Sequence, residues 1–333
     1  MLILSAEEVR AALPMAEAVR AVRWAFEAAA TGAAVAPARI HVNLPRSANV
    51  SLFMPAYVPR DPNGIVPECL IVKAVSVFPN NPVKGLPTVL GAALLLDTET
   101  GACFALLDAA ELTAIRTGAC AGVATDLLAR PDSRTLAVFG TGAQALTQVE
   151  GVCAVRPIET VWVVGRDRSR GEQFLLKLAA RQVGPADLRF TLDSREALRR
   201  ADILCTATTA TDALFDPALV RNGTHINAVG AFKPSMQEIP IETVARSRLF
   251  VDNLSGALSE AGDILQAIEA GAIDSTHIAG EIGEVVAGRM VGRQSPEEIT
   301  LYKSVGMAAQ DAAAGAVAAA RAMEQGIGQR VNS

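Results

Sequence analysis

The spacing of hydrophobic residues changes along the chain, and each change predicts a different group of elements. Residues 5–31 begin with Ser5 and Glu8 at capping-box spacing, and apolar positions then recur every three or four residues, which predicts surface helices. Residues 35–107 carry short apolar runs broken by Pro and Gly, which predict a mixed or antiparallel sheet. The segment DTETG at 97–101 predicts the turn of a hairpin.

The pattern changes again after the segment DAAELTAIRTGACAGVATDLLAR, which predicts a long helix ending before Pro131. Apolar strands then alternate with helical segments, which predicts a parallel, doubly wound sheet covered on both faces. From residue 299 a strand-like start leads into an alanine-rich helix, and the first domain is the surface available to cover it. We therefore predict an α/β protein: a mixed α+β domain (1–120 with 307–333) and a Rossmann-type domain (121–306).

Composition excludes several classes of function. The chain has 333 residues, 50% of them hydrophobic, and a net charge of -5 without a basic block, which argues against nucleic-acid and membrane-surface partners. No apolar run reaches the roughly 18 residues of a membrane span, and the start MLIL is too short for a signal-peptide core, so we expect a cytoplasmic location. The cysteines and histidines lack metal-binding spacing, so we expect buried free thiols and no metal.

The segment AVFGTGAQALTQ, residues 137–148, has the pattern of a dinucleotide-binding turn. Gly140, Gly142 and Ala145 follow an apolar strand directly and open a helix, which is the context that the fingerprint requires. The first glycine permits the tight turn, the second lets the backbone approach a pyrophosphate, and the alanine lets helix and strand pack closely. The flanking pattern favours a cofactor site over an ordinary tight turn.

The end of the next strand, GRDRSRG, bears on the choice of cofactor. An acid there binds the ribose 2′-OH of NAD, whereas an arginine accommodates the 2′-phosphate of NADP. Arg166 comes first, with Arg168 and Arg170 close behind, so we predict NADP(H). Asp167 leaves NAD(H) open, and a solvated loop is the remaining alternative.

Three cations stand among apolar residues in the first domain. Lys73, in CLIVKAVSVF, falls in an apolar strand, and a buried lysine is costly unless it has an anionic partner. Arg116, in LTAIRTGACAG, and Arg39, after AVAP, carry the planar fork that suits bidentate binding of a carboxylate. Each could be a structural ion pair, but beside a nicotinamide site they indicate a small carboxylate substrate.

Several motifs together resemble the ornithine cyclodeaminase/mu-crystallin family. They are VKAVSVFPNNPVKGLPTVLG, ELTAIRTGA, AVFGTGAQALTQ, THINAVGAF and ITLYKSVGMAAQD, and the match runs from about residue 35 to 315. The resemblance implies a Rossmann domain and a substrate domain that is completed by the C-terminal helix and forms a homodimer interface. Members of this family include cyclodeaminases, alanine dehydrogenase, cyclic imino-acid reductases and NADPH-binding mu-crystallins.

The resemblance also assigns roles to individual positions. It implies that Arg39, Lys73 and Arg116 hold the substrate carboxylate. The cofactor positions that it implies are Thr88 and Arg116 at the nicotinamide end, Ala143 and Gln144 at the pyrophosphate, Arg166 at the adenine ribose, and Thr208, Val229, Gly230 and Ser304 along the rest of the pocket, together with Gly140 and Gly142 of the turn.

Two departures from the cyclodeaminase pattern decide the predicted reaction. Phe232 stands where cyclodeaminases of the family carry an aspartate, and Leu52 stands where they carry a glutamate. Ring closure depends on a positioned acid/base, typically worth about 10²- to 10⁴-fold in rate, which these residues cannot supply. We therefore predict NAD(P)H-dependent reduction of Δ1-pyrroline-2-carboxylate or Δ1-piperideine-2-carboxylate to L-proline or L-pipecolate. Lys73 would orient the substrate and relay a proton, and Phe232 would pack against its ring.

Three other functions stay open at this stage. Ornithine cyclodeaminase would need another acid, such as Glu68 or Asp108, in the missing role. An alanine dehydrogenase-like enzyme would use the same carboxylate clamp, and a non-catalytic NADP-binding protein would resemble the crystallin branch. Among features set aside, we interpret residues 261–273 as a surface helix and His225 as a structural hydrogen-bonding residue.

Overall fold

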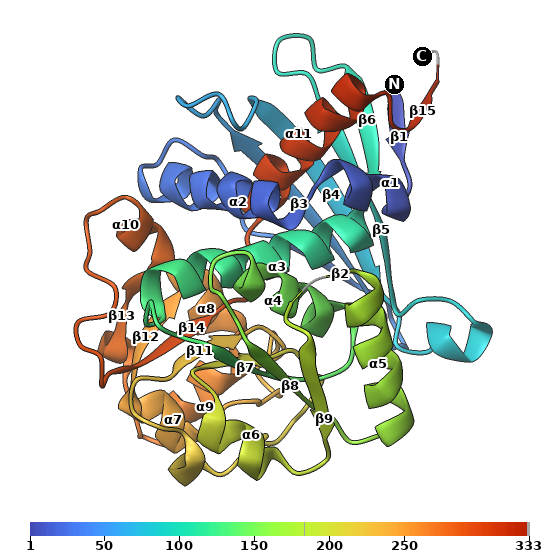
Figure 1. Ribbon diagram of the computed structural model, residues 1–333. Helices are drawn as coiled ribbons and strands as arrows, with labels where there is room; N and C mark the ends of the chain where they lie inside the picture. The colour runs from blue at the N-terminus through green and yellow to red at the C-terminus, as the bar shows by residue number, and fades with distance from the viewer. Residues whose placement is uncertain (183, 332–333) are drawn as a thin grey trace. The chain divides into compact units, whose positions relative to one another are not determined.

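The computed structural model describes residues 1–182 and 184–331 (Figure 1). The chain divides into two compact units. Unit 1 comprises Met1–Arg116 together with Met307–Ser333, and unit 2 comprises Thr117–Gly306. The helix α3 (Ala109–Leu128) begins in unit 1 and continues into unit 2.

Unit 1 is built on a mixed sheet with the strand order β15-β1-β6-β5-β4-β3-β2. Its strands are β1 (Leu2–Leu4), β2 (Ile40–Asn43), β3 (Val50–Val58), β4 (Cys69–Val77), β5 (Val89–Leu96), β6 (Cys103–Asp108) and β15 (Gln329–Arg330). Its helices, besides the start of α3, are α1 (Ala6–Ala12), α2 (Met15–Ala30), η1 (Asn81–Lys84) and α11 (Ala308–Gln325).

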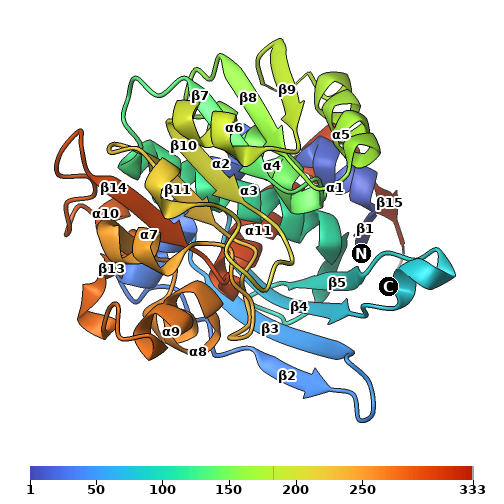
Figure 2. The same ribbon diagram turned by 90° about the horizontal axis from the view of Figure 1, so that it is seen from below.

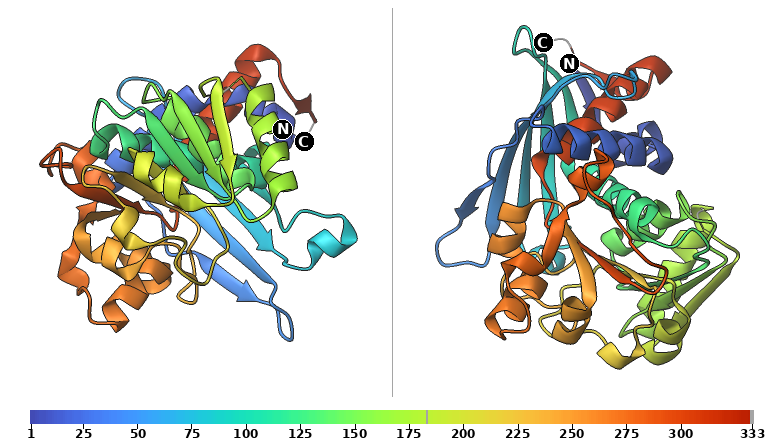
Figure 3. Two further views of the ribbon diagram at one scale, coloured as in Figure 1. Left: turned by 60° about the horizontal axis from the view of Figure 1, so that its bottom comes forward. Right: turned by 90° about the vertical axis from the view of Figure 1, so that its left-hand side faces the viewer.

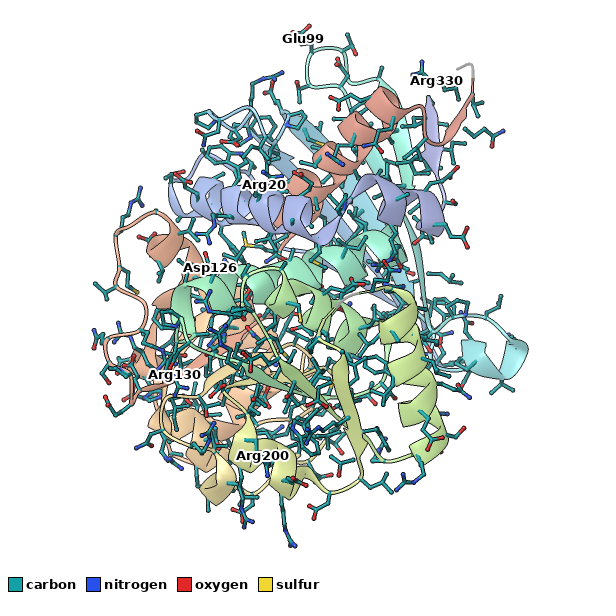
Figure 4. All side chains as sticks on the ribbon, in the orientation of Figure 1. Arg20, Glu99, Asp126, Arg130, Arg200 and Arg330 are labelled. Atoms are coloured by element: carbon teal, nitrogen blue, oxygen red, sulfur yellow. The ribbon has the colours of Figure 1, made fainter. Side chains whose placement is uncertain are left out.

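Local sequence signals account for much of unit 1. The capping box of Ser5 and Glu8 is present at the start of α1, as predicted. The predicted hairpin joins β5 and β6, and Glu99 lies at its tip (Figure 4). The predicted helix α2 is amphipathic: its apolar stripe, which includes Val22 and Phe26, is buried and the helix packs against α11, whereas Arg20 is exposed.

Strand alternation decides which residues of this sheet face the helices. In β4 the buried residues are Cys69, Ile71, Lys73 and Val75, and those between them are only partly buried. The helix α11 packs on β3, β4 and β5, and Figure 3 (right) shows α2 and α11 on one side of the sheet. Lys73 therefore lies on the face of the sheet that the alanine-rich helix covers.

Unit 2 is a parallel sheet with the strand order β13-β12-β14-β11-β10-β7-β8-β9 (Figure 2). Its strands are β7 (Thr135–Phe139), β8 (Thr160–Val164), β9 (Asp187–Thr191), β10 (Ile203–Thr206), β11 (His225–Ala228), β12 (Ser247–Val251), β13 (Ile278–Glu281) and β14 (Ile299–Lys303). Its helices are the rest of α3, α4 (Ala143–Cys153), α5 (Arg168–Ala180), α6 (Ser194–Arg200), η2 (Pro217–Leu219), α7 (Ile241–Arg246), α8 (Leu254–Glu260), α9 (Gly262–Glu269), η3 (Ser275–His277) and α10 (Ile282–Val286).

Apolar residues on both faces explain why this sheet is doubly wound. Leu136 and Val138 of β7 belong to a core cluster that includes Val149 of α4, whereas Phe139 belongs to a second cluster that includes Ile264 of α9. Strands buried on both faces read as continuous apolar runs, which is the pattern predicted for a Rossmann-type sheet. No helix within 1–182 and 184–331 has the length and apolar character of a membrane span.

Candidate active site

Lys73 is the most deeply buried cation of unit 1. Its side chain is 1% exposed, and its Nζ lies 2.6 Å from Oδ2 of Asp311, which is fully buried at the start of α11. The same Nζ donates to Oγ1 of Thr113 at 3.3 Å. The expected anionic partner of Lys73 is therefore a residue that lies 238 positions later in the chain.

Arg116 shares the same carboxylate. Its Nε donates to Oδ1 of Asp311 at 2.9 Å, and its Nη1 donates to Oε1 of Gln310, also at 2.9 Å. The Nε2 of Gln310 is buried without a hydrogen-bond acceptor among the described residues. Two buried cations thus share one carboxylate, and such a concentration of positive charge suits an anionic ligand.

Arg39 belongs to the same electrostatic neighbourhood. It is half-buried, immediately before β2, and its positive charge contributes to lowering the pKa of Lys73. The three cations that the sequence singled out, Arg39, Lys73 and Arg116, are thus close enough for the charges of Arg39 and Arg116 to lower the pKa of Lys73. A nearby anionic group, such as a substrate carboxylate, is favoured by positive charge of this kind.

The environment tunes the pKa of both partners of the buried pair. Burial lowers the pKa of Lys73 to about 8, Asp311 opposes this shift, and Arg116 reinforces it. Burial acts to raise the pKa of Asp311, but the charges of Arg116 and Lys73 outweigh it and hold that pKa below its usual range. Asp311 is therefore ionised at neutral pH, and Lys73 titrates in the range where proton transfer is efficient.

The glycine turn of unit 2 has the geometry that its sequence predicts. Gly140 has φ = 115°, and a Cβ there would lie 2.6 Å from the Ala207 carbonyl oxygen, so only glycine fits. A Cβ at Gly142 would meet nothing within 4 Å, and the residue caps α4, where it leaves room for a ligand. Ala145 is fully buried between α4 and the sheet.

A cleft of about 830 Å³ opens beside this turn. It is lined by Gly140 and Gly142, by Arg166 and Asp167 after β8, and by Thr208 after β10. The first N–H groups of α4, at Ala143 and Gln144, have no partners within the helix and suit a phosphate. The buried Oε1 of Gln144 also lacks a hydrogen-bond partner among the described residues. The open glycine and this helix start fit a dinucleotide.

The other expected cofactor positions of unit 2 gather at the same edge of its sheet. Thr208 follows β10, Val229 and Gly230 follow β11, and Ser304 follows β14, all at the carboxyl ends of parallel strands. Strands β10 and β7 are neighbours although β8 and β9 separate them in the sequence. Ligands of open α/β sheets bind at such a reversal of strand order.

Two further expected site residues are Thr88 of unit 1 and Phe232 of unit 2. Thr88 comes directly before β5. Ala93 of β5 is the register partner of Lys73, and the five residues from Thr88 to Ala93 span about 17 Å along the strand. The structure therefore does not bring Thr88 into the cation cluster. Phe232 lies after β11 in unit 2, two residues beyond Gly230, where the residue is 37% exposed and the amine of Lys233 is 5.8 Å from the ring centre.

The chain matches the model of the ornithine cyclodeaminase/mu-crystallin family over residues 1–326. The chain belongs to this family. A Δ1-pyrroline-2-carboxylate reductase of Bacillus cereus is 37% identical over 332 residues, covering 99% of both chains. The Thermococcus litoralis Δ1-pyrroline-2-carboxylate reductase, solved with NADH and L-proline, is 39% identical with a TM-score of 0.92, covering 99% of this chain and 100% of that chain. An archaeal alanine dehydrogenase dimer with bound NAD is 33% identical, with a TM-score of 0.90, covering 100% of this chain and 99% of that chain.

Within this family, the acids near Lys73 separate the possible reactions. Leu52, the position at which the resemblance implies an acid in cyclodeaminases, lies on the same sheet face as Met54, the register partner of Lys73. Glu68 accepts a hydrogen bond from the hydroxyl of Tyr57, which faces the other side of the sheet. Asp108 accepts from the backbone N–H of Glu111 at the start of α3.

Asp311 is the site residue that the sequence interpretation missed. A signal existed, because it is the first acid in a helix made mostly of alanine, and an isolated carboxylate among small apolar residues needs a cation. No group of three or more His, Cys, Asp and Glu within 1–182 and 184–331 could hold a metal ion.

Replacing Asp311 by asparagine should destabilise the protein more at pH 6.5 than at pH 9. Loss of one partner from a buried ion pair costs about 3–5 kcal/mol. The pKa of Lys73 is about 8 in the folded protein and 10.5 in the unfolded chain, so the unfolded chain binds more protons between these values and stability falls as the pH falls. Without Asp311 the pKa of Lys73 drops further, so the stability of the folded protein continues to fall as the pH is lowered below 8.

Urea unfolding of wild type and D311N at pH 6.5 and pH 9 measures this difference. Lys73→Met provides the matched background, because D311N introduced into it should cost the same at both values of pH. An equal cost of D311N at both values in the wild-type background would contradict the coupling between Lys73 and Asp311.

Proposed function

We propose that this protein is an NAD(P)H-dependent oxidoreductase that reduces Δ1-pyrroline-2-carboxylate or Δ1-piperideine-2-carboxylate to L-proline or L-pipecolate. The observation that carries this proposal is the buried cluster of Lys73, Arg116 and Asp311, on a sheet face to which Leu52 contributes an aliphatic side chain in place of the acid that the resemblance implies for cyclodeaminases. The reductases of Bacillus cereus and Thermococcus litoralis support it, because they match the whole chain and bear the name of this activity.

The residues of unit 1 account for substrate binding. Arg116 and Arg39 hold the substrate carboxylate, and Lys73, with a pKa of about 8, orients the ring and relays a proton to its nitrogen. The cofactor held at the glycine turn of unit 2 supplies the hydride. Fixing the carboxylate restricts the orientation of a small planar ring, and such positioning can supply several kcal/mol of rate acceleration.

The locations of the acids disfavour a cyclodeaminase. Asp311 is ionised and shared by two cations, so it cannot act as a proton donor near neutral pH. Glu68 and Asp108 are engaged elsewhere, with Tyr57 and with the start of α3. Alanine dehydrogenase is the second candidate, because the archaeal enzyme is 33% identical and would use the same carboxylate clamp. A non-catalytic NADP-binding protein would have no need of a buried lysine whose pKa is near 8.

The choice between NADH and NADPH depends on the end of β8. Arg166 and Arg170 line the cleft and favour the 2′-phosphate of NADPH, whereas Asp167 accepts from the backbone N–H of Arg170 and caps α5. The relatives solved with NADH and NAD favour the unphosphorylated cofactor. We infer that NADH is the efficient cofactor and that Arg166 keeps NADPH usable, so the relatives do not support the NADP preference expected from the sequence.

The uncovered face of the unit 1 sheet supports a homodimer. Ile40, Val42, Phe53, Leu90 and Leu94 are between 39% and 58% exposed, and the strand register puts them on one face. Contiguous exposed apolar residues mark interfaces, and the archaeal alanine dehydrogenase is named a dimer. We propose unit 1 as the substrate and dimerisation domain and unit 2 as the cofactor domain. The cytoplasmic location stays a prediction.

The two cyclic imines should oxidise NADH with absorbance loss at 340 nm, whereas L-ornithine with NAD should release no ammonia. Lys73→Met should lower kcat/KM for the imines by about 10²- to 10⁴-fold, because it removes the proton relay. Glu68→Gln, on the other face of the sheet, serves as the control and should retain activity. Formation of proline and ammonia from ornithine at enzymatic rates would overturn the proposal. Reduction of pyruvate that depends on ammonia would favour the alanine dehydrogenase hypothesis.

Arg166→Ala should weaken the use of NADPH by about 10- to 100-fold and leave that of NADH within about threefold, because only NADPH offers a phosphate for a charge-assisted hydrogen bond. The ratio of kcat/KM for the two cofactors measures the effect. Equal losses for both cofactors would show that Arg166 does not contact the 2′-phosphate.

Sedimentation should give a mass twice that of the single chain for the wild type, and Phe53→Glu should shift it toward the monomer, because a charge at the centre of an apolar interface is costly to bury. Val83→Glu is the control, since Val83 is 90% exposed on η1 and lies outside this face. A monomeric wild type, or a dimer that tolerates Phe53→Glu, would contradict this interface.

A further inference from the structure

A second buried carboxylate lies beneath the cofactor edge of unit 2. Glu238, after β11, is fully buried. Its Oε1 accepts from the backbone N–H of Thr208 at 2.6 Å. Its Oε2 accepts from Oγ1 of Thr206 at 2.8 Å and from the backbone N–H of Gly230 at 2.7 Å. One side chain therefore joins the segments that leave two neighbouring strands, β10 and β11.

The carboxylate of Glu238 accepts backbone hydrogen bonds just beyond the point where the pairing of β10 with β11 ends. The pairing of β10 with β11 ends at Thr206 and Ala228, and one more backbone bond runs from Val229 N–H to the Thr206 carbonyl. Beyond this bond, the backbone N–H groups of Thr208 and Gly230 donate to the carboxylate of Glu238 and not to the neighbouring strand. Thr208 also lines the 830 Å³ cleft, so Glu238 fixes backbone that forms the wall of that cleft.

Close approach of Glu238 also explains the glycine at position 230. A Cβ there would lie 2.3 Å from Oε1 of Glu238 and 2.4 Å from the Thr208 carbonyl oxygen. Such distances are impossible for any other residue without movement of the backbone. The carboxylate, with or without a cofactor, therefore requires Gly230.

Two further buried charges hold Glu238 in place. Oδ1 of Asp263 on α9 accepts from the backbone N–H groups of Glu238 and Ile239, at 2.7 and 2.9 Å. Oδ2 of Asp263 lies 2.9 Å from Nζ of Lys303 at the end of β14. Burial raises the pKa of Glu238, the charge of Lys303 opposes this, and Asp263 adds to it. The hydrogen bonds from Thr208 and Thr206 also oppose this increase in the pKa.

We propose that Glu238 is a positioning residue for the nicotinamide cofactor, holding the Thr208 and Gly230 backbone in the form that binds it, and that the Asp263–Lys303 pair holds Glu238. This inference rests on the proposed function, since it takes the cleft of unit 2 as the site of NAD(P)H. Glu238 acts through the backbone at the edge of the cleft.

The glutamine variant tests this role because it keeps the size of the side chain. Both oxygens of Glu238 face backbone N–H donors, so the amide nitrogen that E238Q introduces would oppose a donor in either orientation. Backbone movement that relieves an unsatisfied buried donor recovers about 1–3 kcal/mol, and because binding of NADH would have to reverse this movement, the binding of NADH should be about 5- to 150-fold weaker. At saturating NADH, KM for the cyclic imine should change by less than about twofold.

The experiment is a fluorescence titration of NADH into wild type and E238Q, together with kcat and both KM values. Thr300→Val is the control for general destabilisation. Thr300 is buried at the opposite edge of the same sheet, where its hydroxyl bonds to His225 and the Leu128 carbonyl, so its loss should lower the melting temperature and leave the Kd of NADH unchanged. A loss of NADH affinity in E238Q but not in Thr300→Val supports the proposal.

The possible failures are distinguishable. A wild type that binds neither NADH nor NADPH would overturn the proposed function and the inference together. A wild type that binds NADH while E238Q binds it equally well, or while Thr300→Val loses as much affinity, would overturn the inference alone. If E238Q does not fold, Thr206→Val removes one of the three donors and should still raise the Kd of NADH by about twofold to tenfold. An unchanged Kd there would also overturn the inference.

Discussion

The sharing of one carboxylate by two buried cations determines the architecture of unit 1. Lys73 and Arg116 are buried, and loss of the ion pairs with Asp311 would strongly destabilise the folded state. Because Asp311 is on α11, that helix must lie close against the sheet. Its small residues allow this approach, since even a Cβ at Gly315 would lie only 3.4 Å from Ile71 and 3.6 Å from Leu112.

Local signals in the sequence were enough to predict most of the elements and their order. The capping box, the hairpin turn, the apolar strands of unit 2 and the glycine turn at Gly140 each depend on residues close together in the chain, and the structure has all of them. The need of Lys73 for an anion followed from burial alone. Which acid supplies it did not follow, because no local pattern links residue 73 to residue 311.

Other differences have the same origin. The sequence pattern at 261–273 predicts a surface helix, yet Asp263 is buried. Its partner Lys303 comes from a strand far along the chain, so no local pattern indicates this burial. The sequence predicts Gly230 as a cofactor-binding residue, yet the atom that a Cβ at this position would meet first belongs to Glu238. The roles assigned to the individual site residues stay predictions. In the cluster of unit 1, Arg116 and Lys73 hold the pKa of Asp311 below its usual range, which leaves Lys73 as the group whose pKa lies near neutrality.

The place of α11 in the chain also sets an order on biosynthesis. A ribosome makes Lys73 and Arg116 early, then the whole of unit 2, and only afterwards the helix that carries Asp311. Until that helix is made, the two cations lack the carboxylate of Asp311 and the sheet face that α11 covers is open. The segments of unit 2 are therefore all present before unit 1 is complete, so unit 2 can fold first during translation.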